Sequence, residues 1–182
     1  MAKQFAGKTL VLGIGGGIAA YKCCELARLI VKDGADLRCV LTRAGAQFVT
    51  PLTLQTISAN PVYTDMFSLI QEREIGHISL ADAADLILVA PATADLIAKV
   101  ACGICDELLT AVICATQAPV VFAPSMNANM WKNPIVQENV ERLVKHGYRI
   151  IEPTEGDLAC GYKGKGRLPE PADIIAQITK IL

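Results

Sequence analysis

The sequence has no excess of charge of either sign, no long apolar run and only two histidines. Seventeen basic and eighteen acidic residues give the 182-residue chain a formal net charge of −1, which favours neither a nucleic acid nor an anionic membrane as a partner. No apolar run approaches the roughly 18 residues that a membrane-spanning helix needs. The first residues are too polar, and turn glycine-rich too soon, for a signal peptide. These features predict a cytoplasmic protein without nucleic-acid or membrane partners.

Cysteine is present, but not in the pattern of a disulfide framework or a metal site. The seven cysteines are an odd number and lie mostly in apolar runs, which is typical of a reducing compartment. Cys102 and Cys105 form a C-x-x-C pair, but no second pair or histidine lies near it to complete a zinc site. We therefore expect no metal. The cysteines expected to be small core residues of helices or strands are Cys23, Cys24, Cys39 and Cys114.

Apolar runs and helical patterns alternate along the whole chain. Hydrophobic residues make up 52% of it, enough for one sizeable core. The alternation indicates an α/β fold: a single domain over residues 1–182 with a doubly wound, Rossmann- or flavodoxin-like parallel sheet and helices on both faces. Strands are expected at residues 9–14, 37–41, 86–90, 120–123 and 148–152. Helices are expected at residues 18–32, 44–58 with a break at Pro51, 95–100, 106–116, 134–146 and 171–182.

A glycine cluster joins the first expected strand to the first helix. Gly13, Gly15, Gly16 and Gly17 let the chain turn sharply and let an anion approach the N-terminus of the helix, where free N–H groups favour phosphate. The dinucleotide fingerprint G-x-G-x-x-G is not met, because Ile18 occupies its last position and no carboxylate ends the second strand. The pattern favours the phosphate of a mononucleotide, with a merely tight turn as the alternative.

The sequence APATAD at residues 90–95 follows the third expected strand in a similar way. Small residues let a planar ligand lie close to the backbone, and Thr93 and Asp95 supply polar groups. The other interpretation makes Asp95 only a helix cap. Because both this segment and the glycine cluster end parallel strands, they are expected at one edge of the sheet.

The sequence APSMNANMW at residues 123–131 follows another buried strand and contains the single tryptophan. Asparagine amides bind carboxylates or amides, and methionine and tryptophan form apolar walls. The alternative interpretation makes Asn127 or Asn129 a helix cap.

His77 and Cys160 are further candidates for chemistry. His77 begins or enters a helix, whereas His146 looks like an ordinary residue near the end of one. Cys160 lies among four glycines and three basic residues, whose positive charge would lower a thiol pKa or attract an anionic substrate. We expect residues 153–170 to be a flexible, structureless substrate lid.

Together these motifs resemble the homo-oligomeric flavin-containing cysteine decarboxylases, and within them the phosphopantothenoylcysteine decarboxylases. The segments that carry the resemblance are GGGIAAYK, GHISLADAADLILVAPATADLIAKVA, PSMNANMW and ACGYKGKGRLPEP, in this order. The resemblance is greatest to the decarboxylase half of the bacterial bifunctional protein, whose other half is a phosphopantothenate–cysteine ligase. It implies FMN as cofactor and a stand-alone decarboxylase or a piece fused to, or partnered with, that ligase.

The resemblance also implies roles for individual residues. His77 matches the proposed base for oxidation of the substrate cysteine, Asn127 the residue that binds the substrate carboxylate, and Cys160 the proposed proton donor. The residues that fall on FMN-contacting segments are Gly15, Gly16, Gly17, Thr42, Phe48, Ala92, Thr93, Ala94 and Asp95. Substrate contacts are implied for Met126, Asn127, Met130, Ala159 and Lys163. Two positions depart from the pattern: many relatives have Ser or Thr where Gly15 stands, and many bacterial members have Asn where Asp106 stands.

The implied reaction is the decarboxylation of 4′-phosphopantothenoylcysteine to 4′-phosphopantetheine in coenzyme A biosynthesis. Oxidation by FMN gives a thioaldehyde that accepts the electrons left by CO2, and the resulting ene-thiol is reduced by the same flavin. The implied assembly is a trimer with FMN at the subunit interface, built into a dodecamer. The alternatives are a peptidyl-cysteine decarboxylase, a flavin-binding regulatory subunit without activity, and a prenyl-flavin synthase, which is expected to lack PSMNANMW.

Overall fold

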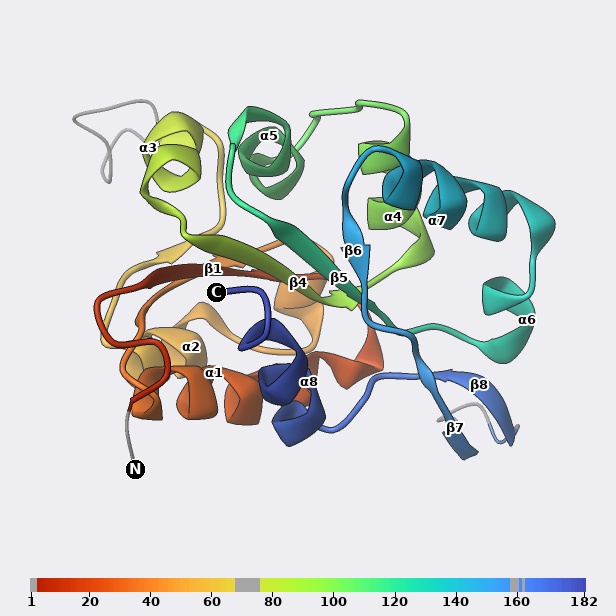
Figure 1. Ribbon diagram of the computed structural model, residues 1–182, viewed down its shortest axis with the longest axis horizontal. Helices are drawn as coiled ribbons and strands as arrows, with labels where there is room; N and C mark the ends of the chain where they lie inside the picture. Colours follow the sequence, from red (N-terminus) through yellow and green to blue (C-terminus); the bar gives the residue numbers. More distant parts are fainter. Residues whose placement is uncertain (1–2, 68–75, 158–160, 162) are drawn as a thin grey trace.

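The computed structural model describes residues 3–67, 76–157, 161 and 163–182. Its centre is a sheet of six parallel strands in the order β3-β2-β1-β4-β5-β6 (Figure 1). The strands are β1 (Thr9–Ile14), β2 (Asp36–Leu41), β3 (Val62–Tyr63), β4 (Leu86–Ala92), β5 (Val120–Pro124) and β6 (Arg149–Ile150).

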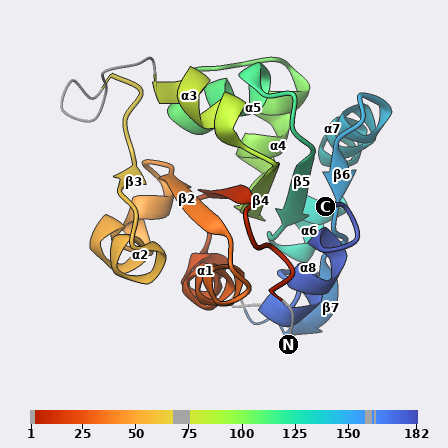
Figure 2. The same ribbon diagram turned by 60° about the vertical axis from the view of Figure 1, so that its left-hand side comes forward.

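Helices cover both faces of the sheet, as the turned view in Figure 2 shows. One face carries α1 (Lys22–Lys32), α2 (Pro51–Ser58) and α8 (Pro171–Ile178). The other carries α3 (Gly76–Ala83), α4 (Ala94–Ala101), α5 (Leu108–Ala115) and α7 (Pro134–Lys145). The shorter elements are α6 (Ala128–Trp131) and the 3-10 turns η1 (Ile18–Tyr21) and η2 (Gly45–Gln47). The predicted doubly wound fold is confirmed.

The central strands are apolar throughout because both of their faces are buried. In β1, Leu12 packs in the core beneath α1 and α8, whereas Val11 packs in the core beneath α4 and α5, as the period-two alternation of a strand requires. Cys23 and Cys39 lie in the first core as predicted. Cys24 is half-buried against this core. Cys114 was also expected to be a core residue, but it is exposed near the end of α5.

The order of the strands creates a crevice at one edge of the sheet. From β1 the chain runs to β2 and β3 on one side, then crosses to β4 on the other. The connections that leave the carboxyl ends of β1 and β4 therefore run in opposite directions, and ligands bind at such a switch point in open α/β sheets.

The segment at residues 153–170 differs from the prediction of a structureless loop. It contains an antiparallel hairpin of β7 (Thr154–Asp157) and β8 (Lys163–Arg167). Sequence patterns did not indicate these strands, since glycine and lysine are depleted in most strands. The glycines are needed here because a Cβ at Gly164 would come within 2.8 Å of Ala128 Cβ. The function of this segment as a lid stays a prediction.

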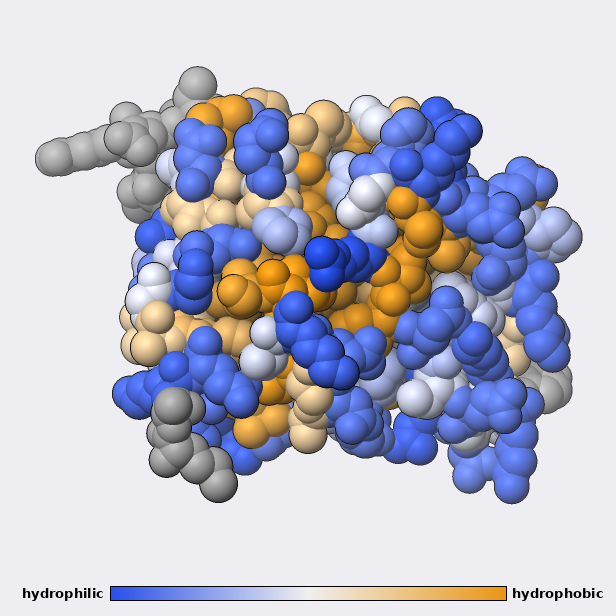
Figure 3. All heavy atoms as spheres, in the orientation of Figure 1, coloured by the Kyte–Doolittle hydropathy of each residue, from blue (hydrophilic) through white to orange (hydrophobic). Residues whose placement is uncertain are grey.

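The surface in the orientation of Figure 1 is divided by polarity. Hydrophilic residues gather over α7 and the hairpin, and apolar residues gather in the middle of the view, between α5 and α8 (Figure 3). Among the described residues, no helix is long and apolar enough to cross a membrane.

Candidate functional site

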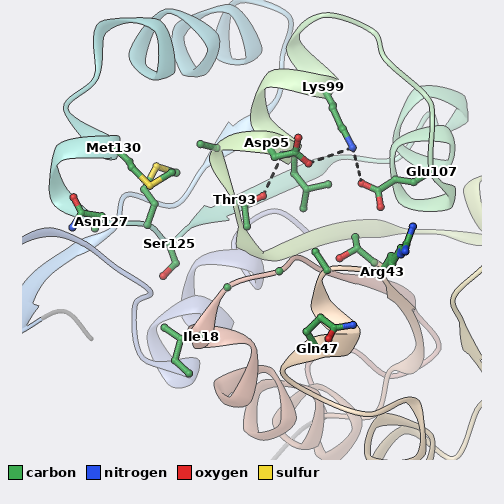
Figure 4. A pocket seen from close by; sticks show the side chains of 18 of the residues that line it. Ile18, Arg43, Gln47, Thr93, Asp95, Lys99, Glu107, Ser125, Asn127 and Met130 are labelled. Carbon is green, nitrogen blue, oxygen red and sulfur yellow. Dashed lines mark hydrogen bonds and ion pairs between the residues drawn. The ribbon is translucent and has the colours of Figure 1, made fainter. Parts of the chain in front are cut away.

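A cavity of about 950 Å³ opens at the carboxyl ends of β1, β4 and β5 (Figure 4). It brings together residues of the glycine cluster and of residues 90–95, which were expected at one edge of the sheet, with residues of the segment 123–131. The predicted site residues that line it are Gly16, Gly17, Thr42, Thr93, Ala94, Asp95, Met126, Asn127 and Met130. The lining residues that sequence reasoning did not identify as site residues include Ile18, Arg43, Gln47, Lys99, Glu107 and Ser125.

The loops after β1, β2 and β4 meet at the base of the cavity with almost no space between them. A Cβ at Gly15 would lie 2.4 Å from the backbone oxygen of Pro91, and one at Gly16 would lie 2.3 Å from Ala44 Cβ. Thr42 is buried, and its hydroxyl donates to Ile14 O at 2.9 Å and accepts from Gly45 N at 2.9 Å. The glycines therefore let these loops approach one another closely at the base of the cavity.

The end of β4 forms the next wall. Thr93 is the N-cap of α4, and its hydroxyl accepts from Leu96 N at 3.2 Å. The interpretation of Asp95 as a helix cap is wrong, because Asp95 lies in the first turn of α4 and its Oδ2 is 3.3 Å from Lys99 Nζ. Both Thr93 and Asp95 line the cavity.

Lys99 joins this wall to residues 102–107, which lead into α5. Its Nζ is 3.2 Å from Asp106 Oδ2 and 3.6 Å from Glu107 Oε1. Burial raises the pKa of the Glu107 carboxyl, against the lowering effect of Lys99. Burial also acts to lower the pKa of Lys99, but hydrogen bonds with Asp106 and Asp95 leave it raised. Asp95 and Lys99 lie four residues apart on one helix, a spacing that favours an ion pair. The sequence therefore contained a signal for this part of the charged group.

The end of β5 forms the third wall. Asn127 is the N-cap of α6, with its Oδ1 accepting from Asn129 N at 2.8 Å. Asn127 therefore both caps this helix and lines the cavity. Met126 N donates to Gly166 O at 2.9 Å, which attaches β8 to this wall. Trp131 was expected in an apolar wall, but its side chain is buried in the core instead.

Several predicted site residues do not line the cavity. Gly15 and Ala92 are buried but do not line it, and Phe48, which follows η2, is exposed and does not line it either. Lys163 is exposed, with its Nζ 3.7 Å from Asp157 Oδ1. Ala159 and Cys160 lie outside the described residues.

His77 also lies outside the cavity lining. It is the second residue of α3 and is half-buried. Its Nδ1 is buried without a hydrogen-bond partner among the described residues. A buried polar atom of this kind is costly, so the imidazole of His77 is a candidate for contact with a group that the isolated chain does not contain.

Comparison with known proteins gives consistent matches over nearly the whole chain. The sequence profile of the family described as Flavoprotein matches residues 2–182. The coenzyme A biosynthesis bifunctional protein CoaBC of Vibrio cholerae is 49% identical over 174 residues, which cover 96% of this chain and 44% of that protein. The Bacillus subtilis CoaBC is 48% identical over 168 residues, 92% of this chain and 41% of that protein. The chain thus spans less than half the length of these relatives.

Two solved structures share the fold closely. A mutant PPC decarboxylase complexed with pantothenoylaminoethenethiol has a TM-score of 0.85 and 30% identity, covering 96% of this chain and 97% of that one. The FMN-dependent cysteine decarboxylase SpaF has a TM-score of 0.85 and 31% identity, covering 97% of both chains.

Proposed function

Since the chain belongs to the flavoprotein family, we propose that it is an FMN-dependent carboxy-lyase that converts 4′-phosphopantothenoylcysteine to 4′-phosphopantetheine in coenzyme A biosynthesis. The observation that carries this proposal is the convergence of the glycine loop, Thr93–Asp95 and Asn127 on one cavity. The identity of 49% to a CoaBC protein over 96% of the chain supports this substrate.

The cavity fits FMN in size and in chemistry. Its volume of about 950 Å³ is near the upper end of the range for small-molecule and cofactor sites, roughly 300–1,000 Å³. A Cβ at Gly17 would meet nothing nearer than Pro91 Cγ at 3.8 Å, so bare backbone faces the cavity there. FMN, when bound, supplies reversible two-electron oxidation of the substrate cysteine, which prepares its carboxylate to leave as CO2.

Asn127 is the proposed residue for the substrate carboxylate. The bond from Asn129 N to its Oδ1 fixes the orientation of its amide at the cavity. An uncharged amide orients a carboxylate without stabilising its charge strongly, which favours loss of that charge as neutral CO2. Met126 and Met130 are the proposed apolar contacts of the substrate beside it.

His77 is the proposed base, and it would act on a site completed by a second copy of the chain. Support for that arrangement comes from its buried Nδ1, which has no hydrogen-bond partner among the described residues, and from its absence from this chain's own cavity lining. The proposed assembly is a homotrimer, itself built into a dodecamer. Support for an interface of some kind comes from large apolar side chains that the isolated chain leaves exposed, Ile18, Tyr21, Phe48 and Leu52, since exposed apolar surface is typical of interaction sites.

Cys160, with Ala159 and Lys163 in the same segment, is the proposed proton donor on a lid. Support for the lid comes from the hairpin itself, because the β8 backbone contacts Met126 directly beside Asn127. The proposed location is the cytoplasm, and the proposed partner is a phosphopantothenate–cysteine ligase, fused or separate, as in the bifunctional relatives.

A second candidate function is the decarboxylation of a cysteine at the end of a peptide; the similarity to SpaF, an FMN-dependent cysteine decarboxylase, supports the reaction type. Mass spectrometry after incubation separates the two. Our proposal expects loss of CO2 from 4′-phosphopantothenoylcysteine and none from a peptide with a C-terminal cysteine. The reverse pattern would refute the proposed substrate, and loss of CO2 from neither would refute the proposed activity.

A further inference from the structure

One wall of the cavity is a group of four charged side chains. Lys99 Nζ lies 3.3 Å from Asp95 Oδ2, 3.2 Å from Asp106 Oδ2 and 3.6 Å from Glu107 Oε1. All four residues line the cavity, and Figure 4 shows Lys99 reaching from α4 between the carboxylates of Asp95 and Glu107. We call these four residues the charged wall.

The charged wall has three carboxylates and one ammonium group. Arg43 is the other charged residue of the cavity lining, so acidic groups exceed basic ones even when it is included. The Lys99 side chain is only 23% exposed, and Glu107 is half-buried. The Asp95 and Asp106 side chains are 67% and 54% exposed, so solvent screens the charges of Lys99 and Glu107 less than those two. With all four groups ionised, this side of the cavity carries more negative than positive charge.

A flavin in the cavity would respond to that charge when it is reduced. Two-electron reduction at neutral pH adds two electrons and one proton to the ring, so the reduced ring carries one more negative charge than the oxidised ring. Nearby carboxylates oppose the added charge, and a nearby ammonium favours it.

Resting on the FMN site proposed above, we propose that the charged wall sets the reduction potential of the bound flavin, with Asp106 and Glu107 lowering it and Lys99 limiting that effect. A low potential would make the reduced flavin a stronger donor in the step that returns the two electrons. Lys99, Asp106 and Glu107 are positioning residues in this proposal, since they act on the cofactor through charge.

The competing explanation is a purely structural clamp between α4 and residues 102–107. The two explanations predict different signs for the changes in reduction potential. If the ion pairs act only as a clamp, removing any one of the partners loosens the contact between α4 and residues 102–107. All variants should then change FMN affinity in the same direction, and the reduction potential should shift without regard to the charge removed. A charge effect moves the potential in opposite directions when the cation and a carboxylate are removed.

The test is a redox titration of the FMN-loaded protein with dithionite against a reference dye at pH 8. Glu107→Gln and Asp106→Asn should each raise the potential and Lys99→Met should lower it, by about tenfold in the reduction equilibrium, which is about 30 mV for a two-electron couple. Lys145→Met removes the same charge from the exposed end of α7 and should leave the potential unchanged.

The outcomes separate this inference from the proposed function. Shifts in one direction for all three variants, or potentials equal to the wild type, would overturn the inference while FMN binding stands. A wild-type protein that binds no FMN after reconstitution would overturn both. If Lys99→Met does not fold, the two nearly isosteric acid-to-amide variants decide, and the absence of a rise in potential overturns the inference.

Discussion

At the scale of single residues, Gly15 shows how closely the loops after β1 and β4 approach each other. A Cβ here would lie 2.4 Å from Pro91 O and 2.8 Å from Leu96 Cδ1. The first of these neighbours is backbone and cannot rotate away. A side chain at position 15 would therefore require these two loops to move apart.

We predict that Gly15→Ala lowers the free energy of unfolding by about 1–3 kcal/mol, the usual cost of overpacking. Gly17→Ala is the matched control, because its Cβ would meet only Pro91 Cγ at 3.8 Å and the backbone there is extended. The control should be neutral or slightly stabilising, since alanine restricts the unfolded chain. Urea unfolding of the FMN-free proteins measures both, and equal stability of the two variants would contradict the account.

At the scale of elements, Asp85 fixes the start of β4 against the start of β1. Its Oδ2 accepts from Thr9 N at 2.8 Å and its Oδ1 from Lys8 Nζ at 3.0 Å. The hydrogen bond from Thr9, followed by that from Lys8, lowers the pKa of the Asp85 carboxyl. These two strands flank the switch point, so their register affects both loops at the base of the cavity.

A lowered pKa in the folded protein gives stability that is complete above the unfolded value, about 3.9, and is lost as pH falls through the folded value. Asp85→Asn should therefore destabilise the protein at pH 7, by about 1 kcal/mol because the side chain is partly exposed, and this deficit should shrink as pH falls from the unfolded pKa through the lower folded pKa. Asp82→Asn, at an exposed position of α3, is the control. Chemical unfolding over a series of pH values from 7 downward checks this, and a deficit that stays constant over the whole series would count against it.

The β7–β8 hairpin is the second element with a direct effect on the site. A Cβ at Gly166 would lie 2.2 Å from Met126 O, next to Asn127. Gly166→Ala should displace this segment and reduce turnover at least tenfold, with a smaller loss of stability. At Gly156 in β7, a Cβ would meet only the flexible Arg167 side chain at 3.3 Å, so Gly156→Ala should keep turnover within about twofold. Equal rates for the two variants would show that β8 does not position Asn127.

At the scale of the whole molecule, the strongest sequence signals gave the architecture. The β1 strand was predicted with its observed bounds because a fully buried strand ends at a glycine turn. β3 was not predicted, because its two residues at the edge of the sheet are too few to show the period-two alternation of a strand. Lys99 was missed because Asp106 and Glu107 reach it only after α4 and α5 pack together, and Arg43 because a charged residue after a strand is indistinguishable from an ordinary loop residue.

The arrangement of His77 and Asn127 gives a prediction about the assembly. If each active site takes His77 from one chain and Asn127 from another, His77→Asn and Asn127→Asp should each abolish activity alone. Mixed and reassembled oligomers should recover it, in about a quarter of the sites for an equal mixture of the two variants in a symmetric oligomer. Turnover of the mixture measures this, and a mixture as inactive as its components would contradict shared sites.

The central claim is that the cavity between the loops of β1, β4 and β5 holds FMN. The most direct measurement is the visible absorption spectrum of the purified protein, before and after reconstitution with FMN, followed by analysis of the chromophore released on denaturation. We predict the bands of an oxidised flavin and release of FMN. A protein that stays colourless after reconstitution would contradict the account.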